Sequence, residues 1–485
     1  MIIGADIGTQ SLKAVVLTPE LKVLGAHAIG YEASFPRPLW AEQDPKLWEE
    51  ALGPAIAGAL RAAGAPARDV KALGLTGQLD GAIAIGADGR PLHPCLIWMD
   101  RRADKETAGI DAGLVLDKAG VVLDATHLAA KIRWLKAHVP AVRRAAKFHV
   151  PVSYMVSRLT GRHVIDHATA STSMVYGLES RDYDPVLLQA FELDAEELPA
   201  PVEAQSVAGE LTQAGAGLTG LRRGIPVAAG TGDDFAATLG AGLVQPGRFI
   251  NVLGTAEVVG ALHPKPVIDR RRLVETHAFI AGHYFVENPG WLSGGALAWF
   301  RDIFRLQDFA ELDSIACDVP PGAAGAIFLP ALSGAMAPEW IAAARGAFYG
   351  LAPSHGTGHL ARALLEGTAF AMRDVLERVQ ALGIGVEALL IAGGGARSRL
   401  WKQIRADLTG LPAETAQHMD SAPVGAALLA AIAARMVDMV DVVNAAKLGA
   451  SGDVIEPNTR NRAAYDEAYE RYRALFQSLK TVFNR

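Results

Sequence analysis

The chain has 485 residues, enough for two or three domains, and its composition of 50% hydrophobic and 20% charged residues excludes extended disorder. Its formal net charge of −6, with Lys and Arg scattered along the sequence, excludes a basic surface for nucleic acid. The two cysteines, Cys95 and Cys317, are too few for a disulfide framework or a cysteine zinc site.

The chain begins with extended segments and then changes to a helix. Runs with β-branched residues and alternating polarity predict strands at residues 2–6, 12–18 and 22–30. The period then becomes helical over 44–64, where Asp44 is the expected N-cap and Gly64 the expected stop. The opening therefore predicts a sheet with a long helix packed against it.

The next part continues the alternation of strands and helices. A short buried strand is predicted at 70–77, and an Asp-Gly turn at 88–89 predicts a hairpin. From about 103 to 225 the pattern is more helical, as expected of an inserted subdomain, with its clearest amphipathic helix at 126–140. This alternation predicts the α/β class.

The pattern restarts near residue 245. Residues 247–262 again predict strand, Gly-Thr turn and strand, followed later by a long helix at 359–383 and a strand ending in glycines at 388–395. The second half therefore echoes the first. We expect two similar lobes, residues 1–245 and 246–485, around a central cleft, where small ligands usually bind.

The sequence predicts no targeting or membrane segment. No basic stretch followed by an apolar core opens the chain. The longest apolar run, residues 422–434, is interrupted by Pro and Gly and is too short for a bilayer span. We expect a cytoplasmic protein without a membrane or nucleic-acid partner.

The first turn, "DIGTQSLK", combines an acid, a glycine, small donors and a lysine. Glycine lets successive backbone N–H groups approach an anion, and Thr9, Gln10, Ser11 and Lys13 add donors and charge. Such a turn can hold nucleotide phosphates, in which case Asp6 would hold a Mg²⁺ ion. The alternative is an ordinary hairpin turn with a capping Asp.

Two adjacent acids open a second motif, "GTGDDF". A strand runs into a Gly-Thr-Gly segment, and Asp233 and Asp234 then begin a helix of small residues. Either acid can simply cap this helix. The functional interpretation makes one of them a general base that the glycine-rich approach exposes to the cleft.

Two further segments are candidates for ligand binding. Three glycines in "IAGGGARSRL" link a buried strand to a helix, which suits a flat or anionic ligand but matches neither Walker A nor G-x-G-x-x-G. The segments "GLTGQLDG" and "LIWMDRR" place polar and aromatic residues at strand ends, as expected for a polyhydroxylated ligand; these residues are Gln78, Asp80, Trp98, Asp100 and Arg101.

Taken together, seven segments resemble the FGGY carbohydrate kinases in that family's order: "GADIGTQSLKAVV", "EQDPKLWEE", "GLTGQLDG", "GTGDDFAATLGAG", "LGTAEVV", "FYGLAPSHGTGHLARALLEGTAF" and "IAGGGARSRLWKQIRADLTG". The resemblance extends from residue 2 to about 435. It implies two ribonuclease H-like lobes of the actin and hexokinase type, with ATP and sugar meeting in the cleft. Family members are often homodimers, and their partners are small sugars or polyols.

The resemblance also implies roles for individual residues. Asp233 matches the catalytic base, which takes the proton from the sugar hydroxyl as it attacks the γ-phosphate. Asp6 would position Mg²⁺, and the hairpin residues would hold the phosphates of ATP. In the second lobe Thr255 would contact phosphate, while Gly394 and Ser398 would lie near the nucleoside.

Within the family the sequence is most similar to the xylulokinase group, whose usual strings are Gly-Gln-Met-His-Gly and Gly-Asp-Asn. Here Leu79 replaces Met, Asp80 replaces His and Asp234 replaces Asn. Asp80 and Asp234 are therefore candidate sugar contacts, and Glu257 is another acid where many relatives have a small residue. D-Xylulose, phosphorylated to xylulose 5-phosphate, is the leading substrate. Another ketopentose or a four- or five-carbon polyol such as erythritol is the alternative.

Two other functions share part of this pattern. An actin-like nucleotide switch would use the same phosphate hairpins, but it does not need the segments "GQLDG" and "WMDRR". A catalytically silent sugar sensor would be expected to lose the base, which is present as Asp233. The sequence thus favours an ATP-dependent sugar kinase over both.

Overall fold

The computed structural model describes residues 1–416, 421–448 and 453–483. Its first sheet has the order β13-β14-β5-β1-β2-β3, and β15 pairs with β5. Strand β1 runs antiparallel to β2 and parallel to β5. The strands are β1 (Ile2–Ile7), β2 (Ser11–Leu17), β3 (Val23–Gly30), β5 (Ala72–Gly77), β13 (Val207–Glu210), β14 (Pro226–Ala228) and β15 (Thr231–Gly232).

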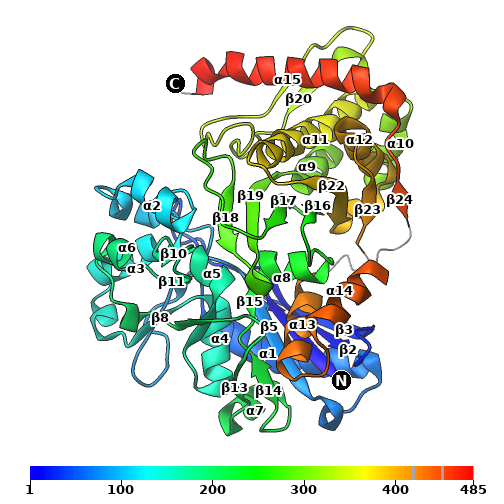
Figure 1. Ribbon diagram of the computed structural model, residues 1–485. Coiled ribbons are helices and arrows are strands. Elements are labelled where there is room, and N and C mark those ends of the chain that lie inside the picture. Colours follow the sequence, from blue (N-terminus) through cyan, green and yellow to red (C-terminus); the bar gives the residue numbers. More distant parts are fainter. Residues whose placement is uncertain (417–420, 449–452, 484–485) are drawn as a thin grey trace.

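The second sheet repeats this arrangement, with the order β18-β19-β17-β16-β22-β23-β24. Strand β16 is antiparallel to β17 and parallel to β22, as β1 is to β2 and β5. The strands are β16 (Gly247–Leu253), β17 (Ala256–His263), β18 (Glu275–Ala278), β19 (Tyr284–Leu292), β22 (Val386–Ala392), β23 (Ala413–Thr415) and β24 (Val454–Ile455). The faint echo between the two halves of the sequence is therefore a repeat of topology, and the two similar lobes are confirmed (Figure 1).

Local signals predicted several of the helices. Helix α1 (Pro45–Ala63) begins after Asp44, whose carboxylate accepts from the backbone N–H of Lys46, and ends at Gly64 in the left-handed conformation. The predicted amphipathic and long helices are α3 (Leu128–His138) and α11 (Thr357–Ala381). The other principal helices are α2 (Ala112–Ala119), α4 (Pro151–Thr160), α6 (Pro185–Phe191), α7 (Gln213–Thr219), α8 (Asp233–Gly240), α9 (Gly294–Phe304), α10 (Phe309–Cys317), α12 (Arg399–Thr409), α13 (Ser421–Ala433), α14 (Met439–Leu448) and α15 (Arg462–Phe483).

The hairpin expected at residues 88–89 forms only in part. Its turn is closed by a bridge between Ile85 and Pro91, and Gly89 adopts a positive φ of 74°. However, β6 (Ile83–Ile85) takes β8 (Lys147–His149) of the helical subdomain as its ladder partner. The paired residues of β6 and β8 are 62 to 66 positions apart in the sequence, so no local pattern reveals this pairing.

Helices α8 and α13 lie where the two sheets approach each other (Figure 1). They pack through small residues: a Cβ on Gly425 of α13 would come within 1.9 Å of the Ala236 carbonyl oxygen of α8. A buried cluster joins both sheets through these helices, with Ile2 from the first sheet, Ile250 from the second and Leu429 from α13. Although α13 belongs to the second half of the sequence, it therefore packs against the first lobe.

Replacing Gly74 by alanine should destabilise the protein by about 3 kcal/mol, because an added methyl group overpacks the contact between β5 and α13. The new Cβ would lie 1.9 Å from the carbonyl oxygen of Ala426, which is backbone and cannot rotate away. Gly217 of α7 is the matched control, since its Cβ would meet nothing within 4 Å. Urea unfolding should show Gly217→Ala unchanged or stabilised by about 0.5–1 kcal/mol; equal stability of both variants would contradict this packing.

A helical subdomain containing α2, α3 and α6 lies beside the first sheet, at the left of Figure 1. It meets the edge strand β18 of the second sheet: the N–H of Thr276 donates to the Gly120 carbonyl at 3.0 Å, and the N–H of Ala278 donates to the Ser171 hydroxyl at 3.1 Å. The lobes are thus joined on this side as well. Within the described ranges no helix is both long and apolar enough to cross a membrane.

Candidate functional site

Three parallel strands of the first sheet end at one edge. In β5, Thr76 pairs with Asp6 of β1 on one side and with Thr231 of β15 on the other. Because adjacent strands lie about 4.8 Å apart, Asp6 and Thr231 are separated by about 10 Å across the sheet. The segments that follow these strands, which contain the phosphate hairpin and Asp233, therefore emerge side by side.

The turn between β1 and β2 is a tight backbone loop. The N–H of Gly8 donates to the Ser11 carbonyl at 3.1 Å, and the Tyr31 hydroxyl donates to the Gly8 carbonyl at 2.7 Å. Gln43 donates to the Thr9 carbonyl at 2.7 Å, while the Gln10 side chain is exposed. Hydrogen bonds from Tyr31 and Gln43 to its carbonyl groups thus fix the conformation of the loop. The donors predicted from the sequence lie in this loop, at the edge of the sheet.

Asp6 and Lys13 are cross-strand neighbours at the base of this turn. Asp6 is buried, and a Cβ on Gly8 would lie 4.0 Å from its Oδ2 atom. A carboxylate oxygen beside a phosphate loop suits Mg²⁺, which takes one or two carboxylates together with phosphate and water oxygens. The described residues contain no group of three metal-ligating side chains, and the assignment of Mg²⁺ to Asp6 stays a prediction.

Asp233 and Asp234 occupy the first turn of α8 and are half-buried. Burial raises the pKa of Asp233 to about 6; hydrogen bonds from the backbone of Asp234 and Leu79 oppose this rise, and the charge of Asp80 adds to it. Burial and the charges of Asp233 and Asp80 raise the pKa of Asp234 to about 8. The pKa of Asp233 therefore lies close to neutral pH, as the pKa of a general base should.

Asp80 and Gln78 follow β5, next to Asp233. Gly232 lies so close that a Cβ there would be 2.0 Å from the Leu79 side chain, which brings the two segments into contact. The Asp80 carboxylate accepts from Thr172 at 2.8 Å and lies 3.2 Å from Nδ1 of His127. Burial disfavours its charge, but His127, with smaller contributions from Lys131 and Thr172, lowers the pKa of Asp80 below its usual value.

Gln78 is buried and points its amide at another side chain. Its Nε2 donates to Oε1 of Gln43 at 2.8 Å, and Trp48 donates to the same oxygen at 3.2 Å. Gln43 in turn supports the phosphate hairpin through Thr9. Gln78 is thus linked to the hairpin through hydrogen bonds by way of Gln43. Its contact with sugar stays a prediction.

The segment "WMDRR" divides into exposed and buried residues. Trp98 is 46% exposed and donates to Oγ1 of Thr9 at 3.0 Å, so it stands at the mouth of the site. Arg101 is exposed and pairs with Asp124 at 2.7 Å. Asp100, in contrast, is fully buried: it pairs with Arg102 at 2.7 Å and accepts from the N–H of Ala41. The structure therefore gives Asp100 a role in folding this loop, because both of its oxygens are already engaged.

In the second lobe the predicted nucleotide residues also gather at one sheet edge. Thr255 lies exposed in the turn between β16 and β17, and Val252 of β16 pairs with Ala392 of β22, just before the glycine run. A Cβ on Gly394 would meet nothing within 4 Å, which leaves bare backbone for a flat group. The Ser398 hydroxyl caps α12 by accepting from the N–H of Trp401 at 3.0 Å. These features fit a nucleoside and its phosphates.

Several important residues lacked a local signal in the sequence. Glu257, noted in the sequence only as an acid where many relatives have a small residue, is fully buried and pairs with Arg405 at 2.7 Å. Asp313 of α10 hydrogen-bonds to Ser398. His127, which pairs with Asp80, and Glu275, which lies on the other side of His127, come from segments that carry no recognisable motif. Only the fold brings these partners together.

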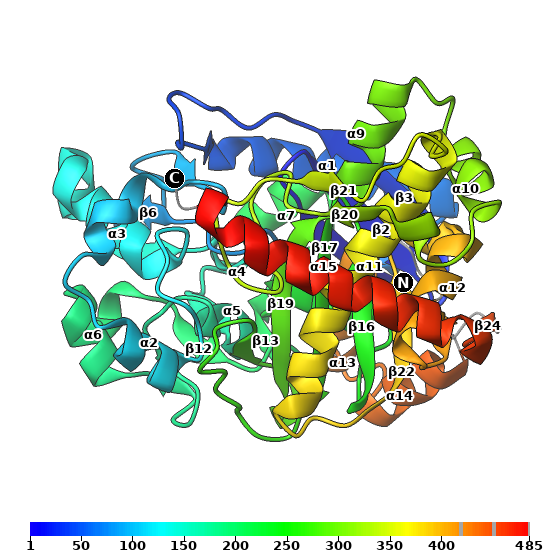
Figure 2. The ribbon, with the colours of Figure 1, turned by 90° about the horizontal axis from the view of Figure 1, so that it is seen from above.

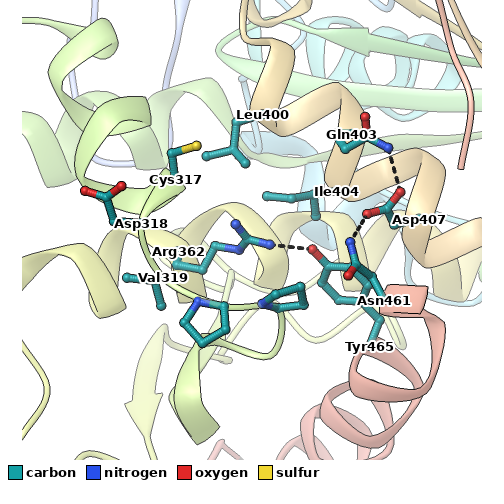
Figure 3. Close-up of a pocket in the computed structure, with 12 residues that line it drawn as sticks. Cys317, Asp318, Val319, Arg362, Leu400, Gln403, Ile404, Asp407, Asn461 and Tyr465 are labelled. Carbon is teal, nitrogen blue, oxygen red and sulfur yellow. Dashed lines mark hydrogen bonds between the residues drawn. The ribbon is translucent and has the colours of Figure 1, made fainter. Parts of the chain in front are cut away.

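A separate cavity of 330 Å³ lies in the second lobe among α10, α11, α12 and α15 (Figure 3). Its polar side chains bond to one another: Arg362 donates to the Tyr465 hydroxyl at 2.6 Å, and Gln403 and Asn461 each donate to Asp407 at 2.7 Å. These bonds attach α15, which crosses the outer side of the lobe in Figure 2. None of the predicted site residues lines this cavity.

Comparisons with known proteins identify the family of this chain. The N-terminal and C-terminal domains of the FGGY family of carbohydrate kinases match residues 1–240 and 249–434. Xylulose kinase of Escherichia coli is 32% identical over 99% of both chains, and glycerol kinase of Alkalilimnicola ehrlichii is 32% identical over 89% of both. The crystal structure of xylulose kinase from Rhodospirillum rubrum covers all of both chains with a TM-score of 0.91 at 30% identity. The chain therefore belongs to the FGGY family of carbohydrate kinases, which are phosphotransferases with an alcohol group as acceptor.

Proposed function

We propose that this protein transfers the γ-phosphoryl group of ATP, bound with Mg²⁺, to D-xylulose and so forms xylulose 5-phosphate. The observation that supports it most directly is the shared edge of the first sheet, where Asp233 emerges beside the Gly8 to Ser11 hairpin. The similarity to a xylulose kinase extends over 99% of this chain, against 89% for the glycerol kinase.

Asp233 would take the proton from the attacking hydroxyl. The hydroxyl oxygen bonds to the γ-phosphorus, the bond from that phosphorus to the bridging oxygen breaks, and ADP leaves. Thr9, Ser11 and Lys13 from the first lobe and Thr255 from the second would orient the phosphates. Phosphoryl transfer depends mostly on positioning and charge stabilisation, so these residues suffice.

The increase of kcat/KM with pH on the acid side of the pH profile should reflect the ionisation of Asp233. Its pKa is raised to about 6, so below that pH the base is protonated and cannot accept the substrate proton. We expect kcat/KM for sugar, measured at saturating Mg-ATP, to rise about tenfold per pH unit up to this value and then level off. Steady-state rates between pH 4.5 and 8 provide the test, and a flat profile over this range would exclude Asp233 as the titrating base.

A four- or five-carbon polyol such as erythritol is the second candidate substrate, and Asp80 is the observation that favours it. An ionised carboxylate stands where the xylulokinase string has a histidine, and carboxylate oxygens accept hydrogen bonds from hydroxyl groups without needing a ketone. Glycerol kinases, at comparable identity, also indicate that a polyol acceptor is compatible with this chain.

A coupled assay of ADP release tests the proposal. The purified protein is mixed with Mg-ATP and, one at a time, D-xylulose, D-ribulose, erythritol, xylitol, ribitol and glycerol. We expect D-xylulose to give the highest kcat/KM, and erythritol in first place would select the second candidate. ADP release that no acceptor stimulates would refute the kinase assignment and favour a nucleotide switch.

A further inference from the structure

A chain of acids and histidines leads from the candidate substrate site into the second lobe. We call Asp80, His127, Glu275, His277 and Glu287 the interlobe cluster. Nδ1 of His127 lies 3.2 Å from Asp80, and its Nε2 lies 4.0 Å from Glu275; Nε2 of His277 lies 3.7 Å from Glu275 and 3.3 Å from Glu287. Asp80 and His127 come from the first lobe, while the other three come from β18 and β19.

The cluster is open to solvent only at Asp80. Its carboxyl side chain is 15% exposed, whereas His127 is 9% exposed and Glu275 5%. Phe235 of α8 contacts the ring of His277, with centroids 5.5 Å apart, so the cluster runs directly behind the helix that carries Asp233 and Asp234. Among the described residues no group of three His, Cys, Asp or Glu side chains is placed to hold a metal ion.

Asp80 is held in an unusual conformation. Its φ is +54°, in the left-handed region that residues other than glycine rarely adopt, and Nζ of the buried Lys131 donates to its carbonyl at 2.7 Å. Strain of this kind persists where surrounding contacts fix it. Thr172 donates to one carboxylate oxygen, and the other oxygen forms an ion pair with Nδ1 of His127 at 3.2 Å without a well-aligned hydrogen bond. A carboxylate has about four acceptor positions, so about two or three remain for hydroxyl groups.

His127 is the cationic partner of Asp80. Burial opposes its charge, but Asp80, Glu275 and Asp124 outweigh burial and raise the pKa of His127 to about 9. The neighbouring His277 behaves oppositely, because burial lowers its pKa to about 3. Glu275, whose oxygen also accepts from the N–H of Val122 at 2.7 Å, thus ties the second lobe to the residue that fixes Asp80.

We propose that His127, supported by Glu275 of the second lobe, is a positioning and specificity-determining residue that holds the Asp80 carboxylate ready to accept from two hydroxyls of an open-chain substrate. This rests on the proposed function. Contact between Gly232 and Leu79 places the carboxyl groups of Asp80, Asp233 and Asp234 close to one another, so the site favours an uncharged ketose or polyol over a sugar acid.

Kinetics of His127→Asn test the proposal. Hydrogen bonds to charged groups contribute enough to change binding by about ten- to a hundredfold, so KM for the best acceptor should rise by that factor. Values of kcat and of KM for ATP should stay within about twofold, because His127 contacts neither phosphate nor Asp233. His138→Asn is the matched control: His138 is the last residue of α3, the helix that begins directly after His127, and it pairs with Glu106 at the surface, so the variant should leave every parameter unchanged.

A double-mutant cycle shows whether His127 acts through Asp80. In an Asp80→Asn background, His127→Asn should add less than about twofold to KM, because the residue that it positions has already lost its charge. The proposal would be overturned if His127→Asn raised KM for the acceptor by the same factor in both backgrounds, or if it left KM unchanged in the otherwise wild-type enzyme. It would also be overturned if the enzyme accepted D-gluconate as well as the best neutral substrate.

Glu275→Gln provides the second variant, should His127→Asn fail to fold. It keeps the shape of the side chain, replaces the carboxyl group that faces Nε2 of His127 at 4.0 Å and should raise KM for the acceptor with little change in kcat. If the wild-type enzyme is active but Glu275→Gln and His127→Asn both keep its KM, this inference is refuted and the proposed function is not. A wild-type enzyme that no acceptor stimulates refutes the proposed function itself.

Discussion

Replacing Asp233 by asparagine should abolish phosphoryl transfer while nucleotide binding persists. Asparagine has nearly the same shape but cannot take a proton, and general base catalysis typically contributes about 10²–10⁴-fold to a rate. Asp233 opens α8, is half-buried and accepts from the N–H of Asp234 at 3.1 Å, so the amide should fit the same place. We therefore expect kcat to fall by about 10²–10⁴-fold, with the same Kd for ATP.

Asp234→Asn is the informative partner of this variant. It recreates the Gly-Asp-Asn string of the xylulokinase group, and the amide can both donate and accept, as a protonated Asp234 does. Asp234 has its pKa raised to about 8 and is therefore mostly protonated at pH 7. Transfer should persist in Asp234→Asn, with a changed KM for the acceptor. Calorimetry with ATP and single-turnover rates separate binding from chemistry, and an active Asp233→Asn enzyme with an inactive Asp234→Asn enzyme would move the base by one residue.

Replacing Asp80 by histidine should shift substrate preference toward D-xylulose. The change restores the residue of the Gly-Gln-Met-His-Gly string and replaces an anionic acceptor with a ring that can donate. Because a hydrogen bond to a charged group contributes about 1.5–3 kcal/mol, the ratio of kcat/KM for D-xylulose to that for erythritol should rise about ten- to a hundredfold. The activity of this variant on polyols should fall, because it lacks the Asp80 carboxylate that accepts hydrogen bonds from their hydroxyl groups.

The control for Asp80→His is Asp88→His. Asp88 is an exposed acid in the nearby turn, where it bonds only to its own loop through the N–H of Arg90 at 3.1 Å, and its replacement should leave the ratio unchanged. Competition between the two acceptors in one mixture measures the ratio directly. An unchanged ratio in Asp80→His would show that this carboxylate does not select the substrate.

Much of the architecture followed from short stretches of sequence. Asp44 and Gly64 cap α1 where their residue types predicted, because capping satisfies the backbone groups of the first and last turns locally. The turn after β1 and the acid pair that opens α8 were recognisable for the same reason. The repeat of topology in the two sheets was visible only as a faint echo, since pairing of strands across the chain leaves little trace in sequence.

The sequence by itself determined the strands, the caps and the motifs at the ends of parallel strands, because each depends on contacts within a few residues. Only the tertiary structure decided which acids are free to act. Asp100 is neutralised by Arg102, and Glu257 by Arg405, 148 positions further along the chain, whereas Asp80 keeps a face toward the site. The reason is physical: a buried carboxylate must find a cation or donors, and those partners come from wherever the fold brings them.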